Sequence, residues 1–118
     1  MLLAEDEPLV RTMTADILEE AGCAVIETAN ASAALAVLDL RPDVQVLVTD
    51  VEMPPGPLNG LDLARLAAER FPHMAVVVVS GRIRPDTREL PPGVRFVPKP
   101  YSATKLTRAV QDALARAA

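Results

Sequence analysis

Residues 75–79 read Ala75-Val76-Val77-Val78-Val79, an unbroken apolar run made mostly of β-branched side chains. Such side chains favour the extended chain. Because no polar residue alternates with them, both faces of the strand are expected to be buried, as in a parallel sheet covered by helices on each side. The run therefore predicts a central strand of an α/β domain.

Outward from this strand, short apolar runs alternate with segments whose apolar residues recur at helical spacing. Pro8 suits the first turn of a helix, and Asn30, Asn59 and Ser102 are suited to cap later ones. We expect further strands at 2–4, 24–26, 44–49 and 94–97, and helices over 8–21, 31–41, 60–71 and from 103 onward. The alternation predicts a doubly wound parallel sheet of five strands with helices on both faces.

One helix of this alternation is weak. Residues 81–93 read GRIRPDTRELPPG, with three prolines and no amphipathic period. Proline removes a backbone donor and clashes with the preceding turn, so there is room for about one helical turn near 86–90. We therefore expect the fourth helix of the fold to be reduced or missing, with a short turn or a mobile segment in its place.

Composition restricts the class of protein. The chain has 118 residues, 50% of them hydrophobic, and a net charge of −4. This length suits one domain, which we expect to span 1–118 with no output domain. A single cysteine excludes an internal disulfide framework, and the acidic balance argues against a nucleic-acid partner. No apolar run is long enough to span a membrane and no signal peptide is visible, so we expect a cytoplasmic protein.

Polar residues stand at the ends of four predicted strands. Glu5 and Asp6 follow the first, Asp50 ends the third, Ser80 follows the fourth and Lys99 follows the fifth. In open α/β sheets, ligands bind outside the carboxyl ends of the strands. Each residue alone has an ordinary interpretation, such as a turn, a helix-terminal acid or a surface lysine. The coincidence of all of them at one edge favours a functional site.

The residue types suggest metal and phosphate chemistry. Carboxylates about 4 Å apart repel by about 4 kcal/mol at an effective dielectric constant of about 20, and a divalent cation relieves that repulsion. Oxygen ligands favour Mg²⁺, which commonly bridges to a phosphate. Lys99 and Ser80 suit phosphoryl oxygens, and a carboxylate is able to act as a nucleophile that forms an aspartyl-phosphate. Asp50 is the natural candidate for that nucleophile.

With these residues in place, the sequence resembles the receiver domains of bacterial two-component response regulators, which have the CheY-like fold. The resemblance covers essentially the whole chain. The motifs that carry it are LLAEDEP at 2–8, LVTDVEMP at 47–54, Gly60, VVVVSG at 76–81 and FVPKPY at 96–101. It implies a sheet with the strand order 2-1-3-4-5, whose switch point lies between the first and third strands.

The resemblance also assigns a metal site. It implies that Asp50 is the phosphoacceptor and that Asp6 and Asp50 bind Mg²⁺. Glu5 would support the ion through water, and the backbone carbonyl of Glu52 would be the remaining protein ligand. The implied phosphodonor is a phosphohistidine on a histidine kinase or histidine phosphotransferase, and the downstream partner is an unknown protein.

The same resemblance assigns the switch. Ser80 would be the switch hydroxyl, Lys99 the lysine that contacts the phosphate and Phe96 the aromatic switch residue, while Tyr101 would be a packing residue. The Lys99–Pro100 bond would be cis. The protein would then be a signalling domain rather than an enzyme, since it assists only its own phosphorylation and dephosphorylation.

Two segments depart from the family pattern. The loop MPPGPLNG at 53–60 is about two residues longer than usual, which either shapes access to the site or is a tolerated surface insertion. The weak fourth helix puts the usual dimer in doubt. Glu52 and Arg82 flank the phosphoacceptor and the switch serine, and they either form a salt bridge across the site or remain solvated.

Other functions stay open at this point. Glu52 stands two residues after Asp50, as the second acid of a Mg²⁺-dependent aspartyl-phosphate phosphatase would. A pseudo-receiver, a binding module that never takes phosphate, is disfavoured because every required residue type is present. Nucleotide binding has no glycine-rich motif to support it. Both a stand-alone receiver and a domain of a hybrid kinase fit the sequence.

Overall fold

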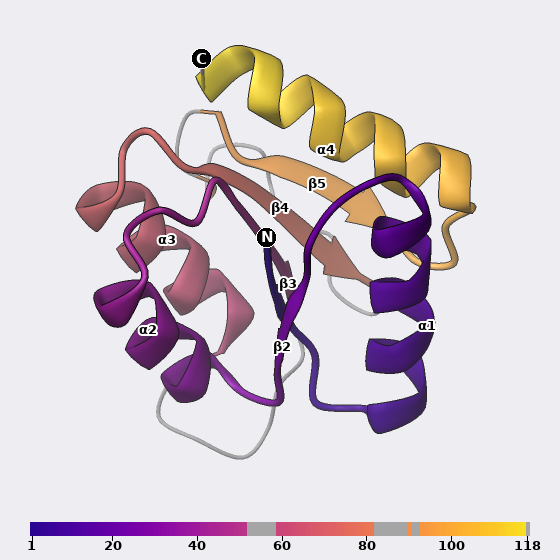
Figure 1. The fold of residues 1–118 in the computed structure, drawn as a ribbon, viewed down its shortest axis with the longest axis horizontal. Coiled ribbons are helices and arrows are strands. Elements are labelled where there is room, and N and C mark those ends of the chain that lie inside the picture. Colours follow the sequence, from indigo (N-terminus) through magenta and orange to yellow (C-terminus); the bar gives the residue numbers. More distant parts are fainter. Residues whose placement is uncertain (52–58, 82–89, 91–92, 118) are drawn as a thin grey trace.

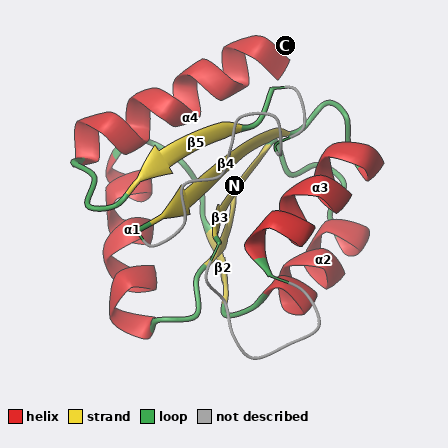
Figure 2. Ribbon diagram, turned by 180° about the vertical axis from the view of Figure 1, so that it is seen from behind, coloured by secondary structure: helices red, strands yellow, loops and turns green. Residues whose placement is uncertain are grey.

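Five parallel strands form one sheet in the order β2-β1-β3-β4-β5, which confirms the predicted topology. The computed structural model describes residues 1–51, 59–81, 90 and 93–117. The strands are β1 (Leu2–Ala4), β2 (Ile26–Thr28), β3 (Val46–Asp50), β4 (Ala75–Ser80) and β5 (Arg95–Pro98), and the described helices are α1 (Pro8–Glu20), α2 (Ala31–Leu40), α3 (Gly60–Arg70) and α4 (Ala103–Ala117). Helices α2 and α3 cover one face of the sheet, and α1 and α4 cover the other (Figures 1 and 2).

The valine run of β4 divides its side chains between two cores. Val76 and Val78 pack with α2 and α3, whereas Val77 and Val79 pack with α1 and α4. Because side chains alternate across a strand, a run with no polar member buries both faces, as the sequence predicted. Leucine, valine and alanine fill most of both cores, which accounts for a chain with only 3% aromatic residues.

Local signals set the helix termini as expected. Pro8 begins α1, and Asn30 accepts a hydrogen bond from the backbone of Ala33 at 2.7 Å. Asn59 forms a capping box with Asp62 at the start of α3, and Gly22 has a positive φ of 95° just beyond α1. These caps satisfy backbone groups that a helix leaves without internal partners.

The second strand begins two residues later than the apolar residues predict. Residues 24–26 were predicted from their apolar character, but β2 is Ile26–Thr28. The partner strand sets this register: Leu2 pairs with Ile26 and Ala4 with Thr28. The Thr28 hydroxyl, which is buried, also donates to the carbonyl of Leu3 at 2.8 Å. Pairing with the three-residue strand β1 therefore sets the bounds of β2, and it outweighs the apolar character of residues 24–26.

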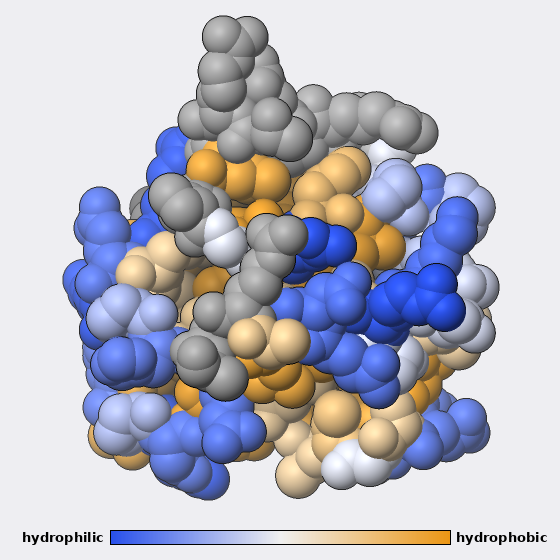
Figure 3. All heavy atoms as spheres, turned by 90° about the horizontal axis from the view of Figure 1, so that it is seen from above, coloured by the Kyte–Doolittle hydropathy of each residue, from blue (hydrophilic) through white to orange (hydrophobic). Residues whose placement is uncertain are grey.

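The expected reduction of the fourth helix falls on residues 82–89 and 91–92, which lie outside the described residues. No helix in the described part of the chain is both long and apolar enough to cross a membrane. Figure 3 shows one face of the molecule, where hydrophilic residues are interspersed with smaller hydrophobic areas.

Candidate functional site

Three carboxylates meet where β1 and β3 end. These strands are neighbours, with Ala4 paired to Thr49, so Glu5 directly after β1 lies beside Asp50 at the end of β3. Ligand oxygens of Glu5, Asp6 and Asp50 all lie within 4.8 Å of one another. Glu5 is only 4% exposed and Asp50 only 5%. The predicted acidic cluster is therefore present, and two of its three members are buried.

Backbone contacts hold Glu5 in place. The N–H of Glu5 donates to the carbonyl of Thr28 at 3.0 Å, and the carbonyl of Glu5 accepts from the guanidinium of Arg11 at 3.0 Å. The side-chain carboxylate accepts from the N–H of Glu7 at 3.2 Å. The start of α1 thus fixes both the backbone and the side chain of the first acid.

Lys99 brings the positive charge to this cluster. Its ammonium lies 2.9 Å from an oxygen of Asp50 and 3.4 Å from an oxygen of Glu5. Burial alone would lower the pKa of Lys99, but the hydrogen bonds and charges of Asp50 and Glu5 outweigh it and raise the pKa above its usual 10.5. The lysine therefore stays charged and offsets part of the repulsion among the acids.

The donor set fits a small divalent cation. Three carboxylates supply only oxygen ligands, and one ammonium leaves a net negative charge in the cluster. Mg²⁺ prefers such ligands and completes its octahedron with water and substrate oxygens. Asp6 is more exposed than the other two acids, so the cluster has a side open to solvent.

The lysine reaches the site from a turn at the end of β5. The N–H of Lys99 donates to the carbonyl of Ser80 at 2.8 Å, which joins this turn to the end of β4. The Lys99–Pro100 peptide bond is cis, as the family pattern predicted. A Cβ at Gly81 would lie 3.3 Å from the Cβ of Lys99, so a larger residue after Ser80 would crowd the lysine.

Ser80 and Phe96 share one face of the sheet. Val78 pairs with Phe96 and Ser80 with Pro98, so Ser80 and Phe96 project to the same side as Val78. Ser80 is 1% exposed, and Phe96 is partly buried against the core under α2 and α3. The two predicted switch residues therefore lie on neighbouring strands and the same face.

Gly60 keeps the third helix close to the end of β3. A Cβ at Gly60 would overlap the backbone carbonyl of Asp50, and the N–H of Gly60 donates to the carbonyl of Val51 at 3.1 Å. Only glycine fits where the helix approaches this backbone so closely. This is the physical reason for the glycine in the family motif.

Two of the remaining predictions concern residues that the structure does not describe. Glu52 and Arg82 lie outside the described residues, so neither the carbonyl ligand nor the salt bridge across the site is placed. A contact that the sequence did not reveal joins Tyr101 to Thr14, whose oxygens lie 2.7 Å apart. The two residues are 87 positions apart, and no local pattern connects them.

Comparison with known proteins agrees with this geometry. The family model described as response regulator receiver domain matches residues 1–111. The response regulator receiver protein CpdR of Brucella abortus is 30% identical over 118 residues, which cover 97% of this chain and 95% of CpdR. The sensor kinase CckA of the same organism is 33% identical over 118 residues, and this chain spans only 12% of that kinase's length.

A solved structure shows the same fold. A response regulator receiver protein from Sinorhizobium medicae superposes with a TM-score of 0.91 at 27% identity, over 99% of this chain and 94% of the other. The family model covers nearly the whole chain, and the acidic cluster, Lys99 and the strand order all agree with it. The chain therefore belongs to the response regulator receiver domain family of two-component signalling.

Proposed function

We propose that this protein accepts a phosphoryl group on Asp50 from a phosphohistidine on a histidine kinase or histidine phosphotransferase. The observation that carries the proposal is the position of Asp50. Its carboxylate is buried at the end of a central strand, 2.9 Å from the Lys99 ammonium and clustered with two further carboxylates. This arrangement supplies a nucleophile, a cation for the phosphoryl oxygens and a place for a metal ion.

The transfer step follows from these groups. A carboxylate oxygen of Asp50 forms the new bond to phosphorus as the phosphorus–nitrogen bond to the donor imidazole breaks, and the electron pair of that bond goes to the departing nitrogen. Asp6 and Asp50 would hold Mg²⁺ directly, with Glu5 acting through water and the Glu52 carbonyl completing the protein ligands. The ion would neutralise charge on the phosphoryl oxygens. Lys99 contacts one of those oxygens, so positioning and charge neutralisation provide the catalysis.

The response to phosphate would travel along β4 and β5. In the proposed switch, the hydroxyl of Ser80 moves to donate to the phosphoryl group and Phe96 moves into the space that it leaves. The shared face of these residues supports the proposal. New phosphate contacts would favour one of two arrangements and so shift their populations.

The partners follow from the same chemistry. We propose that the protein acts in the cytoplasm as one domain over 1–118, with a histidine kinase or phosphotransferase as donor and an unknown protein downstream. The net charge of −4 speaks against a nucleic acid as that partner. We assign no turnover of an external substrate and no membrane partner.

The test is incubation with acetyl phosphate and Mg²⁺ followed by intact-protein mass spectrometry. We expect one phosphoryl group on the wild-type protein and none on Asp50→Asn, which keeps the side-chain shape but removes the nucleophile. Asp112→Asn is the matched control, because Asp112 is half-exposed and pairs with Arg95 away from the site. An unchanged wild-type mass, or a gain that persists in Asp50→Asn, would contradict the proposal.

A further inference from the structure

A partly buried hydrogen bond joins α1 to the turn that carries Lys99. The hydroxyls of Thr14 and Tyr101 lie 2.7 Å apart. Thr14 is 4% exposed, and Tyr101 packs partly buried against the core under α1 and α4. The proposed transfer step uses neither hydroxyl, although breaking the bond would leave the buried Thr14 hydroxyl without this partner.

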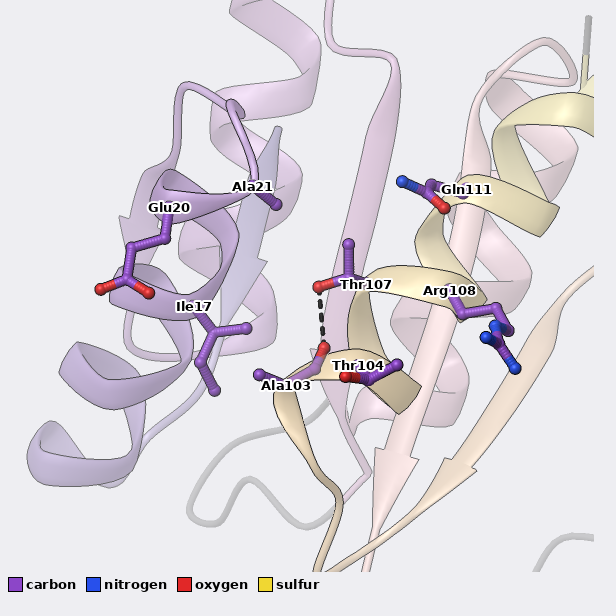
Figure 4. Close-up of a pocket in the computed structure, with 8 residues that line it drawn as sticks. All are labelled: Ile17, Glu20, Ala21, Ala103, Thr104, Thr107, Arg108 and Gln111. Carbon is purple, nitrogen blue, oxygen red and sulfur yellow. Dashed lines mark hydrogen bonds between the residues drawn. The ribbon is translucent and has the colours of Figure 1, made fainter.

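The packing around this bond is open. A surface pocket of about 480 Å³ lies between α1 and the turn, with Val10, Met13 and Ile17 on one side and Lys99, Pro100 and Tyr101 on the other. A second hollow of 360 Å³ continues from Ile17 along α1 and α4, where Ala103 and Thr107 face it (Figure 4). Close packing therefore does not by itself fix the turn against α1.

Apart from the Lys99 ammonium, which contacts Asp50 and Glu5, and Ser102, which caps α4, the described residues give the turn two polar anchors. One is the bond from the Lys99 N–H to the carbonyl of Ser80 at 2.8 Å, which holds the turn to β4. The other is the Tyr101 hydroxyl on Thr14, which holds it to α1. Pro100 stands between Lys99 and Tyr101, and its ring restricts the backbone of this link. A movement of Tyr101 would therefore be passed on to Lys99.

The positions of two of the acids, Glu5 and Asp6, depend on the same helix, α1. Only the N-cap residue Glu7 separates Glu5 and Asp6 from α1, and Glu5 is held by contacts to Glu7 and to Arg11 in the first turn of the helix. The Thr14–Tyr101 bond therefore connects the helix that places the acids to the turn that places the lysine. The Lys99 ammonium lies 3.4 Å from Glu5, across this connection, and 2.9 Å from Asp50 at the end of β3.

We propose that the Thr14–Tyr101 hydrogen bond positions Lys99 against Asp50, so that Thr14 and Tyr101 are positioning residues for phosphoryl transfer. The inference rests on the proposed function of Asp50. Without the bond, the turn relaxes into the neighbouring pocket and the ammonium spends less time at the nucleophile. Both hydroxyls then affect the transfer rate without touching the phosphoryl group.

The first experiment compares rates of phosphorylation by acetyl phosphate. Thr14→Val and Tyr101→Phe remove one hydroxyl each with little change of shape, and each is expected to lower the rate about threefold to tenfold. Thr14→Ser keeps the hydroxyl and should restore most of the rate. Thr107→Val is the matched control, since its exposed hydroxyl bonds only within α4 and its removal should leave the rate unchanged.

Double variants test whether the loss of phosphorylation rate depends on the Thr14–Tyr101 hydrogen bond and on Lys99. Thr14→Val combined with Tyr101→Phe should be no slower than either single variant. In a Lys99→Ala background, Tyr101→Phe should cause no further loss. Full additivity in either pair, or wild-type rates in both single variants, would overturn the inference. Thermal unfolding of each variant shows that it is folded when its rate is measured.

Amide hydrogen exchange separates this inference from the proposed function. Loss of either hydroxyl should reduce protection of the Lys99 amide about threefold to tenfold, while the Leu63 amide of α3 keeps its protection. If the wild-type protein takes no phosphate but Lys99 protection falls, the proposed function fails and the positional effect of the bond stands. If the wild-type protein takes phosphate and the variants match it in both rate and protection, the inference alone fails.

Discussion

The pairing of Lys99 with two buried acids decides how the site behaves without a metal ion. Its ammonium is the cation that contacts both Glu5 and Asp50, at 3.4 and 2.9 Å. Asp50 and Glu5 are almost fully buried, whereas Lys99 is 26% exposed on its side chain, so solvent weakens the pair. Removing the lysine nonetheless leaves two buried carboxylates and Asp6 to repel one another.

We therefore expect Lys99→Ala to lower the free energy of unfolding by about 1 kcal/mol in the presence of EDTA. If Mg²⁺ binds the folded acidic cluster as proposed, it should stabilise both proteins and narrow the difference in stability between them. Urea unfolding with EDTA and with Mg²⁺ measures both effects. Arg108→Ala serves as control, since Arg108 lines the hollow between α1 and α4 instead. A variant as stable as wild type in EDTA, or wild-type stability that is unaffected by Mg²⁺, would contradict this account.

Tyr101 gives the fold a dependence on alkaline pH. Burial raises the pKa of its hydroxyl above the usual 10.0, although the bond to Thr14 and the charge of Lys99 oppose the shift. The folded protein therefore keeps this proton to a higher pH than the unfolded chain does. The corresponding stability is fully present below about pH 10 and is lost as pH rises through the raised pKa.

Urea unfolding at a series of pH values between about 9 and 12 tests this sign. The free energy of unfolding should fall with pH, and it should fall less steeply in Tyr101→Phe. The pKa of Lys99 is also raised, but Lys99 is present in both proteins, so the difference between the two curves reports mainly on Tyr101. Parallel curves would show that the tyrosine does not contribute.

At the scale of the element, two effects oppose one another at the first residue of α3. Steric fit favours glycine there, whereas helix propensity favours a larger residue. Gly60 is the first residue of the helix, and alanine is intrinsically better than glycine within a helix by about 1 kcal/mol. A Cβ at this position would overlap the Asp50 carbonyl. A shift of the β3 backbone or of the helix would therefore disturb Asp50, the proposed phosphoacceptor.

Gly60→Ala is therefore expected to lower the free energy of unfolding by about 1–3 kcal/mol, the range for overpacked sites. Asn59→Ala, which removes the adjacent cap but adds no clash, should cost about 1 kcal/mol and leave phosphorylation largely intact. Gly60→Ala should also slow phosphorylation by acetyl phosphate, because the backbone of Asp50 must move. A stabilised Gly60→Ala protein would show that propensity wins and that the contact is easily relieved.

At the scale of the whole molecule, parallel topology explains how much of the site the sequence reveals. Every strand of a parallel sheet ends at the same edge, so Glu5, Asp50, Ser80 and Lys99 were expected together from their positions alone. The predicted bounds of β2, 24–26, are two residues too early because they depend on pairing with β1, which hydropathy does not report. The Thr14–Tyr101 contact was missed because it joins distant segments through tertiary packing. The roles of Glu52 and of the fourth helix stay predictions.

The same topology indicates how a protein donor approaches. Helix α1 begins at the carboxyl edge of the sheet, beside the acids, and exposes Leu9 and Met13 at 67% and 57%. Helix α2 ends at the opposite edge, where Leu40 is 81% exposed. A phosphohistidine-bearing protein that covers Asp50 would therefore bury the apolar side chains of α1 and leave Leu40 in water.

Leu9→Ser and Met13→Ser should each slow phosphotransfer from the best donor in a panel of histidine kinases by about tenfold, as the loss of a buried apolar contact implies. Acetyl phosphate is too small to use this surface, so its rate should be unchanged. Leu40→Ser removes a comparable apolar side chain at the far edge and should leave both rates at wild-type values. Equal losses with the kinase and with acetyl phosphate would indicate damage to the site, and no loss with the kinase would show that the donor approaches over another element.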